Sequence, residues 1–169
     1  MSALIAFSKQ FGYKPNLLEA VLDVNEKQAL NIVESARQQL GDLVKKRIAI
    51  LGLSFKPNTD DMRDAPSVGI VKRLLDEGAS VVVYDPAAMK NASAIFKDQV
   101  DYAKSGLECV SNADCAIIVT EWDEFRKFRP DDFKEKMRCA VLIDGRKIYD
   151  PLRFSKELNY VGIGLGSLI

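Results

Sequence analysis

The stretch Lys45-Lys-Arg-Ile-Ala-Ile-Leu-Gly-Leu-Ser-Phe-Lys-Pro-Asn-Thr-Asp-Asp-Met-Arg63 decides the fold of this protein. Its apolar run over residues 48–52 ends in glycine, a pattern typical of a strand that is buried on both faces. After the polar loop, Pro66–Glu77 has the apolar spacing of a helix, which a glycine ends. The apolar run Val81–Asp85 follows. We therefore predict a strand, a crossover helix and a parallel second strand, which together form one βαβ unit.

The same alternation continues along the rest of the chain. Helical stretches lie near residues 106–112 and 130–137, between strand-like runs at residues 100–103, 115–120, 140–144 and 160–162. Six strands that alternate with helices predict an α/β fold. We expect a doubly wound, Rossmann-like parallel sheet with the strand order 3-2-1-4-5-6.

A long helix is expected before the sheet. Pro15 and Asn16 form a start signal and Gly41 a stop signal, so we predict one helix over residues 16–40. Such a helix is about 37 Å long at about 1.5 Å per residue, which is more than a small domain needs for its own core. Part of its apolar stripe should therefore contact another surface, which favours self-association. The stripe consists of Leu17, Val21, Val24, Ala29, Ile32, Val33, Ala36 and Leu40.

The charge balance narrows the possible partners. Lys plus Arg and Asp plus Glu both total 24, so the net charge is zero, and no basic excess favours nucleic acid or an anionic membrane surface. The longest apolar runs are far shorter than the roughly 18 residues of a membrane span. Residues 1–12 lack the apolar run of a signal peptide. We expect a cytoplasmic protein that binds neither nucleic acid nor membrane.

The residue types limit the chemistry. The sequence has no histidine, which excludes Ser-His-Asp and Cys-His nucleophile pairs and removes the commonest ligand of catalytic zinc. Cys109, Cys115 and Cys139 lack the C-x-x-C spacing of metal or redox sites. We interpret them as free thiols that pack as small buried apolar residues, and we expect no metal site.

The candidate ligand site is the carboxyl edge of the sheet, where doubly wound folds bind nucleotides. The loop after the first strand is too poor in glycine for the G-x-G-x-x-G turn of dinucleotide sites. It contains Lys56 and Arg63, which are either phosphate ligands or solvated loop charges. Arg146 follows the fifth strand at the same edge, and its guanidinium fork can hold a phosphate. Asp85, at the end of the second strand, has two interpretations: a ribose contact or a structural turn residue.

Residues 55–63 form the motif F-K-P-N-T-D-D-M-R, and five shorter motifs, or sequence words, accompany it. The shorter words are Val24-Asn25 with Gln28, Val83-Tyr-Asp-Pro86, Thr120-Glu-Trp-Asp-Glu-Phe125, Ile143-Asp-Gly-Arg146 and Tyr160-Val-Gly-Ile-Gly164. In content and order they resemble the UDP-glucose/GDP-mannose dehydrogenase family over nearly the whole chain.

This resemblance implies an NAD-dependent nucleotide-sugar 6-dehydrogenase, which oxidises a sugar CH2OH group to a carboxylate with two NAD+ through a cysteine adduct. Residues 1–44 would be the end of the family's central dimerisation domain, with a homodimer contact along helix 16–40. Residues 45–169 would be its nucleotide-sugar (UDP)-binding Rossmann-like domain. NAD would be bound mainly by a domain that is absent from this chain.

The resemblance also implies site residues. Phe55 and Lys56 would line the nucleotide-sugar site, with Lys56 near a pyrophosphate or sugar oxygen, and Arg146 would hold the substrate's phosphates. Arg63 resembles a residue on the cofactor side of the cleft. None of the three cysteines matches the family's nucleophile. We therefore expect no catalytic residue in this chain, and a fragment that is inactive alone.

The sequence leaves two other classes of protein open. One is a free-standing nucleotide-binding or regulatory module with the same fold. The other is an ordinary NAD domain, against which the missing glycine fingerprint argues. The nucleotide sugar is left open among UDP-glucose, a UDP-N-acetyl sugar and GDP-mannose.

Overall fold

The computed structural model describes residues 1–165, and the side chains of all of them except Ser2, Glu26 and Ala29. Its centre is a six-stranded parallel sheet in the order β3-β2-β1-β4-β5-β6, which confirms the predicted topology. The strands are β1 (Arg47–Leu51), β2 (Ser80–Tyr84), β3 (Asp101–Tyr102), β4 (Cys115–Ile118), β5 (Val141–Asp144) and β6 (Asn159–Gly162).

The apolar residues of the strands alternate between two hydrophobic cores. In β1, Ile48 and Ile50 belong to one core, whereas Ala49 and Leu51 belong to the other. The parallel register aligns Ile48 with Val81 of β2 and with Cys115 of β4. Each such row of side chains across the sheet points to the same face. This is why the strands are apolar throughout rather than alternating.

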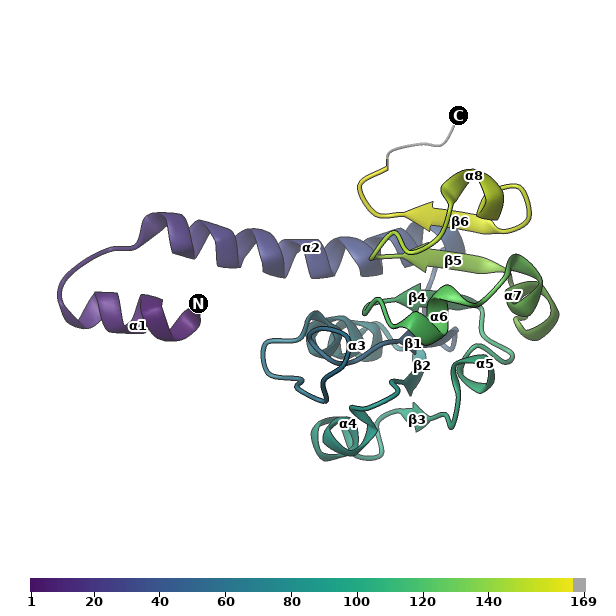
Figure 1. The fold of residues 1–169 in the computed structure, drawn as a ribbon, viewed down its shortest axis with the longest axis horizontal. Helices are drawn as coiled ribbons and strands as arrows, with labels where there is room; N and C mark the ends of the chain where they lie inside the picture. The colour runs from purple at the N-terminus through teal and green to yellow at the C-terminus, as the bar shows by residue number, and fades with distance from the viewer. Residues whose placement is uncertain (166–169) are drawn as a thin grey trace.

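Helices cover both faces of the sheet (Figure 1). One core includes residues of α2 (Asn16–Leu40), α3 (Pro66–Asp76) and α4 (Met89–Phe96). The other includes residues of α5 (Gly106–Cys109), α6 (Asp123–Arg126), α7 (Pro130–Lys136) and α8 (Pro151–Phe154). The predicted helices at α2, α3, α5 and α7 are confirmed. The short helices α4, α6 and α8 were not predicted.

The long helix α2 belongs only in part to this layered structure. Near its C-terminus, Ile32, Val33 and Ala36 are buried in the same core as α3. Towards its N-terminus it extends beyond the sheet, and the helix α1 (Ser2–Gln10) folds back beside it (Figure 1). There Leu17 is 78% exposed. Among the described residues, no helix combines the length and the apolar character that crossing a membrane requires.

Candidate functional site

The loops that follow β1, β4 and β5 meet at the carboxyl edge of the sheet, and Gly52 packs against Thr120 there. Its φ is +94°, and a Cβ built on it would lie 2.6 Å from both the Cβ and the backbone nitrogen of Thr120. Only glycine combines this left-handed backbone with so close a neighbour. The loop after β1 is therefore packed directly against the loop after β4.

Asp85 organises the interior of this edge. Its carboxylate is buried and accepts hydrogen bonds from six donor groups. Oδ2 receives the backbone N–H groups of Leu53 and Ser54, the Ser54 hydroxyl and the Trp122 indole N–H, at 2.7 to 3.0 Å. Oδ1 receives the N–H groups of Ala87 and Ala88.

These contacts decide how Asp85 is interpreted. Burial alone raises the pKa of a carboxyl group, but backbone N–H donation from Ser54 and Leu53 outweighs it, so the pKa of Asp85 lies below its ordinary value. Both oxygens are used inside the protein, which favours the structural turn role over a ribose contact. Asp85 fixes where the loop after β1 leaves the sheet.

Phe55 and Lys56 follow this anchored segment directly. Ser54 is 1% exposed, whereas the Phe55 ring is half exposed and Lys56 is exposed. The Phe55 N–H donates to the carbonyl of Asp61 at 2.8 Å, so the loop closes on itself. The chain thus turns from fully buried to solvent-facing within two residues, and it presents an aromatic ring and an ammonium group at the edge.

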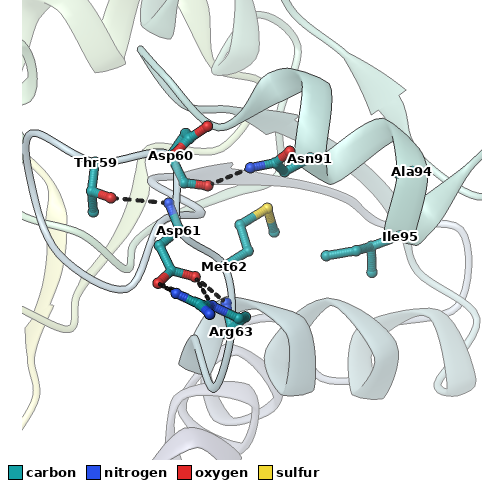
Figure 2. Close-up of a pocket in the computed structure, with 8 residues that line it drawn as sticks. All are labelled: Thr59, Asp60, Asp61, Met62, Arg63, Asn91, Ala94 and Ile95. Atoms are coloured by element: carbon teal, nitrogen blue, oxygen red, sulfur yellow. Dashed lines mark hydrogen bonds and ion pairs between the residues drawn. The ribbon is translucent and has the colours of Figure 1, made fainter.

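Arg63 lies in the same loop but is turned towards Asp61. Its guanidinium donates to the Asp61 carboxylate at 2.8 to 3.2 Å, as Figure 2 shows. This bonding, with the field of nearby Lys56, lowers the pKa of Asp61 to about 2. The Arg63 side chain is 90% exposed. The two residues line an open pocket of about 620 Å³ together with Thr59, Asp60, Met62, Asn91, Ala94 and Ile95.

Arg146 is fixed at one end of its side chain. Its Nε donates to the carbonyl of Val119 at 2.6 Å and lies 3.2 Å from the Glu121 carboxylate. Its backbone N–H donates to the buried carboxylate of Asp144 at 3.0 Å. With Nε engaged in this way, the two terminal nitrogens of the guanidinium are the groups available to a bound anion.

The sequence patterns predicted no role for Thr120, Glu121 or Trp122, although these residues are part of one of the family motifs. Thr120 is fully buried, and its hydroxyl donates to the carbonyl of Ser54 at 2.6 Å. Nothing in the local pattern distinguishes these residues from ordinary loop residues, because their partners are distant in sequence.

The cysteines do not contribute to this site. Cys109 and Cys115 are buried free thiols whose pKa is raised by burial, as expected for small apolar residues. The expected burial of Cys139 was wrong, because it is exposed. Cys139 precedes β5 and so lies at the amino edge of the sheet, away from Lys56. Within residues 1–165, no group of three or more acidic or cysteine side chains is placed to hold a metal ion.

The loop after β1 does not fit the pyrophosphate of a dinucleotide. In the G-x-G-x-x-G mode, a glycine leaves room for the pyrophosphate against the backbone. Here the space beside Gly52 is filled by Thr120. The backbone beside Gly52 therefore leaves no room for the pyrophosphate of NAD.

A doubly wound sheet with exposed cationic side chains on the loops at its carboxyl edge defines a nucleotide-binding domain of the Rossmann type. Residues 49–151 match the model of the UDP-glucose/GDP-mannose dehydrogenase family, UDP binding domain. The chain belongs to this family, and the resemblance found in the sequence is confirmed.

Individual relatives support the same assignment. UDP-glucose 6-dehydrogenase AglM of Haloferax volcanii is 44% identical over 147 residues, 87% of this chain and 33% of that protein. UDP-glucose 6-dehydrogenase TuaD of Bacillus subtilis is 38% identical over 165 residues, 98% of this chain and 36% of that protein. A UDP-glucose dehydrogenase structure from Pyrobaculum islandicum has a TM-score of 0.80 at 33% identity, covering 95% of this chain and 35% of that one. The chain spans about a third of the length of these relatives.

Proposed function

We propose that this chain is the nucleotide-binding part of an NAD-dependent nucleotide-sugar 6-dehydrogenase that oxidises a sugar CH2OH group to a carboxylate with two NAD+. The observation that carries the proposal is the match of residues 49–151 to the family's UDP binding domain, with relatives named UDP-glucose 6-dehydrogenases. In this assignment the chain supplies binding rather than redox chemistry, since its only exposed cysteine lies at the edge away from the site.

In the proposed site, Lys56 and Arg146 bind the phosphates of the nucleotide sugar and Phe55 lines the site beside them. Lys56 contributes a mobile point charge, and Arg146 contributes a guanidinium that is already held at its Nε. Hydrogen bonds between charged groups are stronger than neutral ones, so these two residues should supply most of the affinity for a diphosphate.

The cofactor is proposed to lie on the side of Arg63. Its exposed guanidinium borders the open pocket in Figure 2. NAD itself would be held mainly by residues outside this chain, since the loop after β1 does not fit its pyrophosphate. We expect this chain alone to form no NADH from NAD+ and a nucleotide sugar. The three unpaired thiols agree with a cytoplasmic location.

The arm formed by α1 and the N-terminal part of α2 is proposed to be the homodimer contact, and residues 1–44 the end of a dimerisation domain before the nucleotide-sugar-binding domain 45–169. Ile32 to Leu43 share the core of the sheet, so the two parts differ in role and are not separate folding units. Exposed apolar side chains on the arm support this contact. They are Met1, Leu4, Phe7, Phe11, Tyr13, Leu17, Val21, Val24 and Leu30.

Calorimetric titration with UDP and GDP tests the binding site. Charge-assisted hydrogen bonds contribute roughly 1.5–3 kcal/mol, so Arg146→Ala should weaken binding by about 10- to 150-fold, and Lys56→Ala similarly. The matched control is Lys136→Ala. Lys136 is exposed at the end of α7, and its backbone carbonyl accepts a hydrogen bond from Asn112, which precedes β4. It therefore lies at the opposite edge of the sheet from the proposed site. Unchanged affinity in Arg146→Ala would remove this residue from the site.

Sedimentation equilibrium tests the dimer contact. Leu17→Glu places a charge on the exposed arm and should shift the chain to monomers that remain folded. Leu152→Glu is the control, since Leu152 is 69% exposed on α8, away from the arm. A parent chain that is monomeric at high concentration would contradict the dimer proposal and leave the nucleotide site unaffected.

A further inference from the structure

The segment Val119–Trp122 lies between the two proposed phosphate ligands and contacts both of their loops. This follows from the sheet order, in which β4 is flanked by β1 on one side and β5 on the other. The loop after β4 therefore lies between the loop that carries Lys56 and the loop that carries Arg146.

On the β1 side, Thr120 and Trp122 hold Ser54, the residue that precedes Phe55. The Thr120 hydroxyl donates to the Ser54 carbonyl at 2.6 Å. The Trp122 indole N–H donates to the Ser54 hydroxyl at 3.2 Å and to Asp85 at 3.0 Å. Ser54 is therefore fixed through its carbonyl and through its side chain, and both contacts are buried.

On the β5 side, the same segment holds Arg146. The Val119 carbonyl accepts from the Arg146 Nε at 2.6 Å, and the Glu121 carboxylate lies 3.2 Å from that nitrogen. A short stretch of backbone thus carries contacts to both sides. Its position sets where the backbone that carries Lys56 lies relative to the guanidinium of Arg146.

We infer that Thr120 and Trp122 are positioning residues of the nucleotide-sugar site, which hold the Phe55–Lys56 loop in the place where Lys56 can share a diphosphate with Arg146. The inference rests on the proposed function for the identity of the ligand. The two residues act through Ser54, because Thr120 is fully buried and Trp122 is only 9% exposed. Holding the loop before the ligand arrives lowers the conformational entropy lost on binding.

The first experiment needs no nucleotide. Backbone amide resonances and hydrogen exchange are measured for the parent, Thr120→Val, Thr120→Ser and Trp122→Phe. We expect Thr120→Val and Trp122→Phe to shift the Phe55 and Lys56 amides and speed their exchange. Thr120→Ser keeps the hydroxyl and should resemble the parent. The control is Tyr149→Phe, which removes another buried hydroxyl bond, to the Phe125 carbonyl at 2.7 Å, and should leave both amides in place.

The second experiment measures UDP affinity by NMR titration, which also covers weak binding. A net hydrogen-bond contribution of this kind corresponds to about 2- to 12-fold, so Thr120→Val should weaken binding by that factor, and Thr120→Ser should restore it. In a Lys56→Ala background the effect of Thr120→Val should become smaller, whereas in Arg146→Ala it should persist in full. A general loss of stability would weaken binding equally in both backgrounds.

The outcomes separate the two proposals. If the parent does not bind UDP, the proposed function is wrong for this chain, and the amide measurements still decide the positioning role. If Thr120→Val leaves the Phe55 and Lys56 amides unmoved, or weakens UDP binding equally in both backgrounds, the positioning role is overturned while the nucleotide site stands.

Discussion

Replacing Gly52 by alanine tests whether the close packing of the loops after β1 and β4 holds the edge of the sheet together. The added Cβ would lie 2.6 Å from the Cβ and the backbone nitrogen of Thr120 and 2.9 Å from its Cα. Two of these three atoms belong to the backbone, so no side-chain rotation relieves the contact. The φ of +94° adds strain of its own for any residue with a Cβ.

The expected cost is the sum of these two effects. Strained backbone costs about 1–3 kcal/mol, and overpacking a well-filled site costs about 1–3 kcal/mol. Gly52→Ala should therefore lower the free energy of unfolding by about 2–6 kcal/mol, out of the roughly 5–15 kcal/mol that domains possess. Such a loss is measurable as a lower urea midpoint with an unchanged m-value.

Gly69→Ala is the matched control. Gly69 lies inside the helix α3, and nothing lies within 4 Å of a Cβ built on it. Alanine in a helix interior is favoured over glycine by roughly 0.5–1 kcal/mol, so this variant should become more stable. If the unfolding free energy of Gly52→Ala lies within about 1 kcal/mol of the parent's, the change is smaller than either effect alone should produce. That result would refute the packing argument.

Two further predictions concern buried groups. Because the pKa of Asp85 is lowered in the folded chain, the stability that its carboxylate contributes should be complete above about pH 5 and decline as the pH falls towards about 3. The difference in unfolding free energy between the parent and Asp85→Asn, measured by urea titration, should therefore shrink over that range. A constant difference would contradict the assignment. With a thiol reagent, only the exposed Cys139 should react quickly in the native protein, whereas Cys109 and Cys115 should react after unfolding; fast labelling of all three would show that the core is open.

The sequence determined the order of the elements and their type. The continuous apolar run of residues 48–51 and the helical spacing of residues 66–76 are local patterns, each written in neighbouring residues. Parallel strands joined by right-handed crossovers leave few possible topologies, so the strand order 3-2-1-4-5-6 followed from the alternation itself. The family motifs also placed Phe55 and Lys56 in a nucleotide-sugar site, and this role stays a prediction.

Only the tertiary structure decided which polar side chains of the edge turn inward. Asp85 reads in the sequence as a possible ribose ligand, yet six donor groups from three loops occupy its carboxylate. Thr120 bonds to Ser54 across 66 positions of sequence. Such pairs have no local signal, because they form only when the parallel register brings the ends of β1, β2 and β4 to one edge. A hydroxyl or carboxylate buried there needs hydrogen-bond partners, and these are the donor and acceptor groups of the loops that follow the neighbouring strands.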